Sequence, residues 1–369
     1  AGSRAGIFSH RPDMGSQPGT KQQHPHHGHH QKGHIGQNVM AAEDLSQHRN
    51  GTHTGNGHAR EHFGGNAGGA ALILQEHVHD KHRSAAPRPL VGILLPDISN
   101  LFFSSIGQAF LLEARAQGSD AIVMVHGDQP GQDLANPDTL LSRGVGGVVM
   151  VRSARTTPEE EDTLREKILK SRIPVVVMDR KMDIPNVKSV LLDNREGARM
   201  AVRYLLEQGH TRIGCITGPL EDVVCRERLL GYQDALEEAA IAYDESLICQ
   251  GDYRPEDGVK YLPYLLGKSV TGIFCFNDMI SLGVYTGCRA YHLRIPVDLS
   301  VIGYDGIPFC ETLDVPLSTV EQPVEEMGRA AATLLKQMMY QPQCAQDRLF
   351  LPSLQIRAST ASPADPSRR

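Results

Sequence analysis

The pattern of hydrophobic and polar positions changes sharply near residue 90. From Leu90 onward, short apolar runs rich in Val and Ile alternate with longer stretches whose apolar residues recur at helical spacing. The short runs predict buried strands and the longer stretches predict amphipathic helices. Such alternation is typical of a parallel α/β architecture, because a strand needs a crossover helix before its parallel neighbour.

Two successive series of these units are predicted. The first has strands at 90–95, 121–126, 147–151 and 175–179, with helices at 104–117, 133–142 and 158–170. The second has strands at 189–192, 213–217, 247–250, 272–276 and 300–304, with helices at 196–208, 226–239, 256–266 and 279–291. A strand and loop at 317–323, a helix at 325–338 and a strand at 348–357 follow. Two doubly wound series predict two lobes, and the last elements can cross between them and leave a cleft.

A polar loop follows the first predicted strand. Ser99 and Asn100 precede two adjacent aromatic residues, Phe102 and Phe103. In open parallel sheets, ligands bind at the carboxyl edge, where loops meet the N-termini of the following helices. An amide beside two aromatic faces suits a sugar, which carries hydroxyls on its rim and C–H bonds on its faces. Both phenylalanines fit the core of a helix start equally well.

Residues 1–88 have a different composition. Fourteen of the seventeen histidines lie here among Gly, Gln, Asn and Ser, without a sustained apolar periodicity. Such a segment buries too little apolar surface to offset its chain entropy, so we expect it to be disordered. Its histidines at 24, 26, 27, 29, 30 and 34 can bind a transition metal adventitiously, but we predict no dedicated metal site.

Composition narrows the function further. The 369-residue chain has a formal net charge of −6, so it lacks the basic surplus of a nucleic-acid-binding protein, and no apolar run reaches the roughly 18 residues of a membrane span. No secretory signal is apparent, and seven cysteines without a Cys-x-x-Cys pair favour reduced thiols in a cytoplasmic protein. We find no Gly-x-Ser-x-Gly, His-Glu-x-x-His or phosphate-loop motif, and therefore predict no catalytic residue, no cofactor and no enzyme activity.

A series of short motifs runs from about residue 90 to residue 357. They are Val91–Phe103, Asp179-Arg180, Leu192–Asn194, Gly209–Gly214, Ile216–Pro219, Arg226–Tyr232, Phe276–Asp278, Val301–Asp305 and Leu317–Pro323. In this order they resemble the lactose/galactose repressor (LacI/GalR) family, most of all its ribose-repressor branch, and periplasmic ribose-binding proteins share the same core. The resemblance implies two periplasmic-binding-protein-like lobes joined by three crossovers, a sugar or nucleobase effector in the cleft, and a homodimer.

The resemblance also implies an effector site. Aromatic rings from the first lobe would sandwich a sugar ring, an acid and a base would grip its hydroxyls, and the second lobe would add an arginine and a polar pair beside a hinge glutamine. The residues that match these positions are Asn100, Phe102, Phe103, Asp179, Arg180, Arg228, Asn277, Asp305 and Gln322.

Several neighbouring residues have a structural interpretation. We expect Asp193 and Arg226 to hold the hinge and a helix start, and His126 and His210 to be satisfied surface or core residues. Asp278 is expected to cap the helix that begins at residue 279. Asp305 can either cap the next turn or bind the ligand, and its place after a buried strand favours the ligand.

We expect the chain to be divided into four parts. A disordered segment, 1–88, stands in place of a headpiece; the first lobe takes 89–190 and about 320–340; the second takes 191–319 and about 341–358; a tail takes 359–369. Family members usually begin with a helix-turn-helix headpiece and a hinge helix. No stretch of residues 1–88 matches these elements, so no DNA-contact residue is assigned. Three explanations of the missing headpiece remain open. Residues 1–88 are a fused or expression segment, or an out-of-frame reading of the upstream region, or the protein is a natural effector-only relative.

The expected function is therefore a sugar-responsive transcriptional regulator of repressor type. Its partners would be a small sugar, with a pentose such as ribose favoured, and a second copy of the chain in a cytoplasmic homodimer. Operator DNA is expected for the family, although residues 1–88 do not support it. The alternative is a transport-type periplasmic sugar-binding protein, and an enzyme is the third hypothesis.

Overall fold

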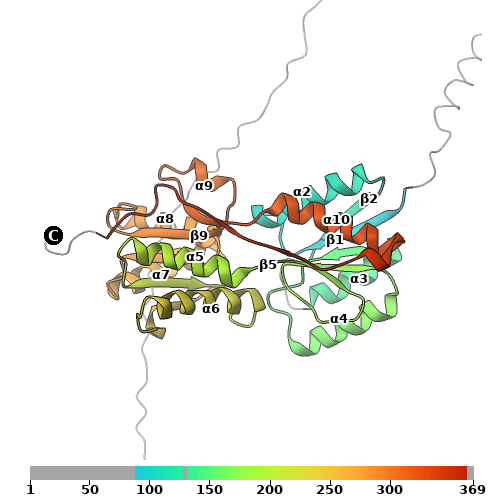
Figure 1. Ribbon diagram of the computed structural model, residues 1–369, viewed down its shortest axis with the longest axis horizontal. Coiled ribbons are helices and arrows are strands. Elements are labelled where there is room, and N and C mark those ends of the chain that lie inside the picture. Colours follow the sequence, from blue (N-terminus) through green and yellow to red (C-terminus); the bar gives the residue numbers. More distant parts are fainter. Residues whose placement is uncertain (1–87, 128–130, 364–369) are drawn as a thin grey trace, which may run out of the picture. The chain divides into compact units, whose positions relative to one another are not determined.

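The structure is a computed structural model, in which residues 88–127 and 131–363 are described. Their strands form two six-stranded sheets (Figure 1). In the first sheet the order is β11-β5-β4-β3-β1-β2, and every pair is parallel. Its strands are β1 (Leu90–Leu95), β2 (Asp120–Val125), β3 (Val148–Met150), β4 (Val175–Met178), β5 (Lys188–Leu192) and β11 (Arg348–Phe350).

The second sheet has the order β12-β10-β9-β8-β6-β7. Only β12, at its edge, runs antiparallel to its neighbour. The strands are β6 (Ile213–Thr217), β7 (Ile248–Gln250), β8 (Gly272–Cys275), β9 (Ser300–Asp305), β10 (Ser318–Glu321) and β12 (Ser353–Gln355).

Helices cover both faces of the first sheet. Alternate residues of β1 point to opposite faces. Ile93 packs in one core cluster with Ile106 of α2 (Leu101–Ala116) and Leu335 of α10 (Val324–Tyr340). Leu94 packs in another cluster with residues of α3 (Gln132–Ser142) and α4 (Pro158–Ser171). A strand that is apolar at every position therefore fits only a sheet that is covered on both sides. We call this sheet with its four helices the first lobe.

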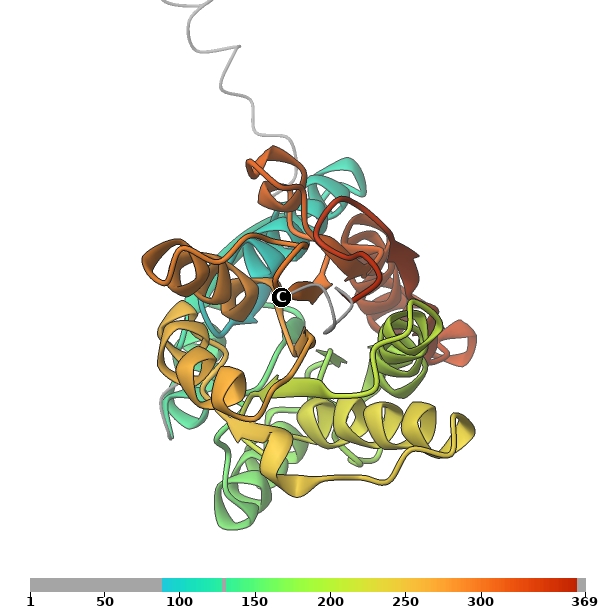
Figure 2. The ribbon, with the colours of Figure 1, turned by 90° about the vertical axis from the view of Figure 1, so that its left-hand side faces the viewer.

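The second lobe repeats this plan around the other sheet. Helix α5 (Asn194–Glu207) packs against α6 (Val223–Glu238), and α7 (Pro255–Gly267) packs against α8 (Asp278–Ala290). Figure 2 shows these two helix pairs on different sides of the sheet. A short helix, α9 (Phe309–Thr312), and the 3-10 turns η1 (Glu245–Leu247) and η2 (Pro342–Cys344) complete the described elements.

Three connections carry the chain between the lobes. Strand β5 of the first lobe leads directly to α5 of the second, β10 leads back to α10, and β11 leads to β12. The connecting residues are Asp193, Gln322-Pro323 and Leu351-Pro352. The predicted α/β fold with two doubly wound lobes and three crossovers is confirmed.

The structure corrects three assignments near these connections. Residues 189–192 were expected to open the second series, but β5 pairs with β4 in the first sheet. The single strand predicted at 348–357 is two strands in different sheets, separated at Pro352, which has no N–H for a ladder. Accordingly β11 lies in the first sheet, whereas 341–358 had been placed in the second lobe.

The predicted polar tail, 359–369, begins as part of the core. Ser359 and Thr360 are buried, and the Ser359 carbonyl accepts a hydrogen bond from Val301 N. Of the segment 1–88 that was predicted to be disordered, only Arg88 is among the described residues. Its histidines lie outside them. Within the described part of the chain, no helix is both long and apolar enough to cross a membrane. All seven cysteines are free, and only Cys344 is exposed.

Candidate functional site

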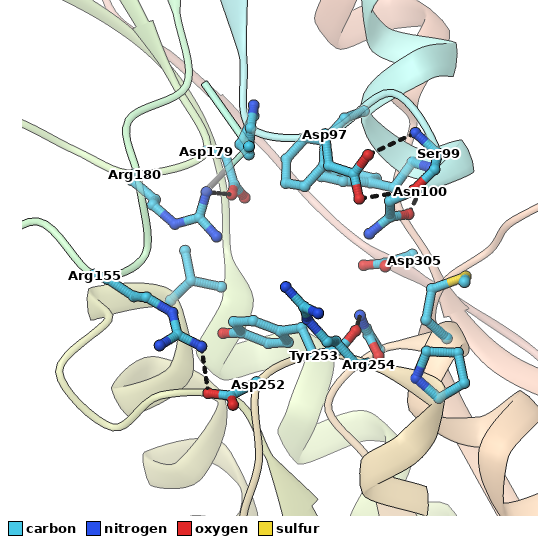
Figure 3. Close-up of a pocket in the computed structure, with 18 of the residues that line it drawn as sticks. Asp97, Ser99, Asn100, Arg155, Asp179, Arg180, Asp252, Tyr253, Arg254 and Asp305 are labelled. Atoms are coloured by element: carbon cyan, nitrogen blue, oxygen red, sulfur yellow. Dashed lines mark hydrogen bonds and ion pairs between the residues drawn. The ribbon is translucent and has the colours of Figure 1, made fainter. Parts of the chain in front are cut away.

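A cavity of about 300 Å³ lies where loops of the two lobes meet. Its first-lobe lining follows the carboxyl ends of β1, β2, β3 and β4. Its second-lobe lining follows β7 and β8, ends β9, or lies in the first turns of α6. Figure 3 shows Asn100, Asp179, Arg180, Tyr253 and Asp305 around this space. The carboxyl edges of both parallel sheets therefore line the same cavity, as expected for ligand sites in open α/β sheets.

The structure brings together eight of the nine predicted site residues as lining of this cavity. The ninth, Gln322, lines a neighbouring cavity instead, yet its Nε2 donates a 2.8 Å hydrogen bond to Asp305 Oδ1. The eight are Asn100, Phe102, Phe103, Asp179, Arg180, Arg228, Asn277 and Asp305.

Asn100 and the two phenylalanines are positioned by the start of α2. Asn100 is the N-cap, and its Oδ1 accepts a 3.0 Å hydrogen bond from Phe102 N. The two rings meet edge to face with centroids 5.0 Å apart, and both residues belong to the core while also lining the cavity. Their core role and their place in the cavity therefore coexist, and the rings offer fixed apolar faces.

Asp179 and Arg180 form an ion pair directly after β4. Arg180 Nη1 lies 3.5 Å from Asp179 Oδ2, and its Nε donates to Asp222 Oδ2 of the second lobe at 3.1 Å. Asp179 adopts a left-handed φ of 63°, and its buried Oδ1 has no hydrogen-bond partner among the residues that the structure describes. Burial raises the pKa of Asp179, while the charges of Arg180 and Arg228 oppose that rise. An unpartnered buried acceptor on a cavity wall suits a ligand hydroxyl.

Arg228 and Asp305 are the buried charges of the second lobe. Arg228 Nη2 lies 3.8 Å from Asp305 Oδ1, and both side chains are 4% exposed. Burial raises the pKa of the Asp305 carboxyl, and the Arg228 charge opposes this. Asp305 has a φ of 120°, which an L-residue adopts only where surrounding contacts hold it.

Asn277, not Asp278, caps helix α8. Asn277 Oδ1 accepts from Ile280 N at 2.8 Å, and its Nδ2 donates to the Tyr253 carbonyl at 3.0 Å. The predicted capping role of Asp278 is wrong. Its buried carboxylate accepts from Gly306 N and Thr319 Oγ1, at 2.8 and 2.7 Å, and fixes the loop after Asp305. Burial raises the pKa of Asp278 to about 6.

The other structural expectations agree with the observed contacts. Asp193 caps α5 through Glu196 N at 2.9 Å, and Arg226 donates to the carbonyls of the loop before α6. His210 Nδ1 and Nε2 contact Thr271 Oγ1 and the Ala361 carbonyl, and His126 Nε2 contacts the Val151 carbonyl. None of these four side chains lines the cavity.

Sequence reasoning missed a group of residues around the cavity. Tyr253 lines it and donates from its hydroxyl to Asp222 Oδ2 at 3.1 Å. Arg155 of the first lobe and Asp252 of the second also line it and form a 2.7 Å ion pair. A polar loop after the predicted strand at 247–250 was a usable signal for 252 and 253. Asp222 gave none, because its partners are distant in sequence.

No group of three potential metal ligands occurs among the residues that the structure describes. The cavity offers hydrogen-bond acceptors, guanidinium donors and aromatic faces from two lobes. This combination fits noncovalent recognition of a small, hydroxyl-rich molecule.

Comparison with known proteins agrees with this geometry. The family described as periplasmic binding protein-like domain matches residues 202–360. The HTH-type transcriptional repressor CytR of Escherichia coli K12 is 34% identical over 271 residues, which are 73% of this chain and 78% of CytR. The repressor PurR of Vibrio atlanticus is 32% identical over 248 residues, 66% of this chain and 73% of PurR. A crystal structure of a LacI family transcriptional regulator from Enterococcus faecium with bound ribose aligns with a TM-score of 0.68 and 28% identity, covering 74% of this chain and 100% of that one.

Proposed function

Because the chain belongs to the LacI family of transcriptional regulators, we propose that it is a repressor-type regulator whose effector is a small sugar such as ribose. The observation that carries this proposal is the cavity, where polar side chains of both lobes surround one space beside two aromatic rings. We assign it no catalytic step, in keeping with its repressor relatives.

The chemistry of the lining suits a polyol. Sugar hydroxyls can donate to Asp179 and Asp305 and accept from Arg180 and Arg228, and the C–H faces of the ring can pack on Phe103. Hydrogen bonds to charged groups contribute about 1.5–3 kcal/mol each, roughly twice those between neutral groups. The bound ribose in the Enterococcus faecium relative supports a pentose.

The proposed regulation follows from the position of the cavity. A ligand that bonds to both lobes binds more tightly when they are close together, and so shifts the population toward that state. The shift is limited by the difference in the ligand's affinity for the two states. We propose that it is coupled to operator binding by a headpiece of the family type. Residues 1–88 supply no recognisable one.

We also propose that the regulator is a cytoplasmic homodimer. The first lobe presents large apolar side chains to solvent on α2 and on its edge strand β2, namely Leu112, Val123 and Val125, with exposed fractions of 63, 38 and 41%. Exposed apolar patches mark association surfaces. Analytical sedimentation should show a dimer. Leu112→Asp should weaken the dimerisation affinity at least tenfold. Leu230→Asp, which changes an exposed residue of α6, should leave the dimer intact. A strictly monomeric wild type would favour the transport-type alternative.

Isothermal titration calorimetry tests the effector assignment. Ribose, other pentoses, hexoses and purines are titrated into the protein, and we expect saturable binding of a pentose with one site per chain. Arg228→Met should greatly weaken it while leaving a measurable residual affinity, whereas Arg212→Met, which removes a half-exposed side chain near Asp244, should not weaken it. Absence of binding by every sugar, with an unchanged melting temperature, would reject the sugar assignment.

A further inference from the structure

Arg228 is restrained on several sides by residues that do not line the cavity. Its guanidinium carbon lies 3.6 Å from the centroid of the Tyr304 ring. Its Nε donates a 2.9 Å hydrogen bond to Asn194 Oδ1, and its Nη1 donates to the Phe276 carbonyl. With two of its five N–H donors engaged in this way, the guanidinium can neither turn nor tilt freely.

Tyr304 and Asn194 are themselves fixed. Both are fully buried, at 0 and 1% exposure, and neither lines the cavity. The Tyr304 hydroxyl lies 3.5 Å from the Asn194 carbonyl. A Cβ added at Gly197 of α5 would lie 2.3 Å from that hydroxyl, so the ring fits against α5 only because residue 197 is glycine.

We propose that Tyr304 and Asn194 are positioning residues for effector recognition, which hold the Arg228 guanidinium at a fixed angle to the cavity. The inference rests on the proposed function of the cavity. An arginine side chain has many rotamers, and restraining it before the ligand arrives removes an entropy cost from binding. Stacking on Tyr304 also favours a desolvated cation that Asp305 contacts only at 3.8 Å.

The affinity for ribose, measured by calorimetry, is the first test. Tyr304→Phe keeps the ring and should bind within about twofold of wild type. Tyr304→Leu removes the π face and should bind about 5- to 30-fold more weakly, the range that cation–π energies of roughly 1–2 kcal/mol give. Asn194→Ala should weaken binding in the same direction. Equal affinity of the Phe and Leu variants would overturn the proposal.

A double-mutant cycle separates positioning from general damage to the fold. In an Arg228→Met background there is no guanidinium to position, so Tyr304→Leu should change the residual affinity less than about threefold. The same loss in both backgrounds would mean that Tyr304 acts on the lobe as a whole, which contradicts the proposal.

Gly197 provides a test if Tyr304→Leu does not fold. Gly197→Ala should displace the ring and weaken ribose binding. Adding Tyr304→Phe removes the hydroxyl at 2.3 Å, the shortest of the clashing contacts, and leaves ring carbons at 2.9 and 3.0 Å, so it should restore part of the affinity. No restoration would count against the proposal.

A spectroscopic readout is independent of any ligand. The Nε–H proton of Arg228 should show a ring-current shift in NMR spectra of the wild type and of Tyr304→Phe. Tyr304→Leu should abolish this ring-current shift, and Gly197→Ala should change its size. If wild type binds no ribose but the shift is present, the proposed effector fails while the positioning stands. Absence of the shift overturns the positioning itself.

Discussion

Two asparagines of the cavity are also helix caps. Asn100 caps α2 and Asn277 caps α8, each through its Oδ1. Because Oδ1 is used in the cap, Asn100 can offer its amide nitrogen to a ligand in the cavity that it lines, whereas the amide nitrogen of Asn277 donates to the Tyr253 carbonyl. A single residue type therefore links local helix geometry to the proposed ligand site.

Replacing Asn100 separates these two roles. Serine is as good an N-cap as asparagine but lacks the amide, so Asn100→Ser should keep the free energy of unfolding within about 0.5 kcal/mol. Ribose affinity should fall about 3- to 10-fold, the loss of one neutral hydrogen bond of roughly 0.5–1.5 kcal/mol. Asn100→Ala should lose affinity and also about 1 kcal/mol of stability. Calorimetry and urea unfolding measure the two effects, and wild-type affinity in Asn100→Ser would remove the amide from the site.

At this scale, motif position predicted which residues face the cavity, but not every role. Asn277 and Asp278 are adjacent and both can cap, so the sequence could not distinguish them, and the structure uses the asparagine. The contacts of Asp222 with Arg180 and Tyr253 span 42 and 31 residues. No local pattern encodes such pairs.

Among the elements, His210 connects three segments of the second lobe. It follows α5. Its ring contacts Thr271, just before β8, at 2.8 Å and the carbonyl of Ala361, in the segment after β12, at 2.9 Å. Since the Ala361 carbonyl can only accept, Nε2 carries the proton and Nδ1 of the neutral ring accepts from Thr271. Burial lowers the pKa of His210 from its usual 6.5.

This predicts a pH-dependent contribution to stability. The unfolded chain takes up the proton at His210 before the folded protein does, so stability is complete above about pH 6.5 and declines as the pH falls below it. His210→Gln should flatten the curve of unfolding free energy between pH 7 and 5, and His292→Gln, at an exposed position, should leave it unchanged. If the His210 variant followed the wild-type curve, the neutral buried ring would be excluded as a cause.

Element type was predictable where strands such as β3 and β4 are short, fully apolar runs and helices such as α5 and α10 have an amphipathic 3.6-residue period. The ranges at 90–95 and 213–217 match β1 and β6. The sheet to which β5, β11 and β12 belong could not be predicted from the sequence. These strands have only three to five residues and lie near a crossover, and nothing in such short runs indicates which lobe they join. Pro352 was the one local cue that the last strand is divided.

At the scale of the whole molecule, two ion pairs join loops of the first lobe to loops of the second beside the cavity. Arg180–Asp222 is buried, with side chains 5 and 0% exposed, whereas Arg155–Asp252 is 40 and 52% exposed. The two pairs therefore differ in how much the loss of one partner changes the free energy of unfolding. Removing one partner of a buried pair leaves an uncompensated charge, while an exposed pair is screened by water.

Matched substitutions test this difference. Asp222→Asn keeps an N-cap for α6 but removes the charge, and should lower the free energy of unfolding by about 3 kcal/mol, the low end for a broken buried pair, because Asp179 still lies 3.5 Å from Arg180. Asp252→Asn should lower it by less than about 1 kcal/mol. Urea unfolding gives both values. Similar small losses for the two variants would mean that Arg180 is not held by Asp222.

The most direct test of the account is a crystal structure of the protein grown with ribose. We predict one ribose in the cavity, packed against Phe103, with oxygens within hydrogen-bond distance of Asp179 or Arg180 from the first lobe and of Arg228 or Asp305 from the second. A ribose that contacts one lobe alone, or an empty cavity at saturating ribose, would contradict the claim that both lobes bind a single sugar.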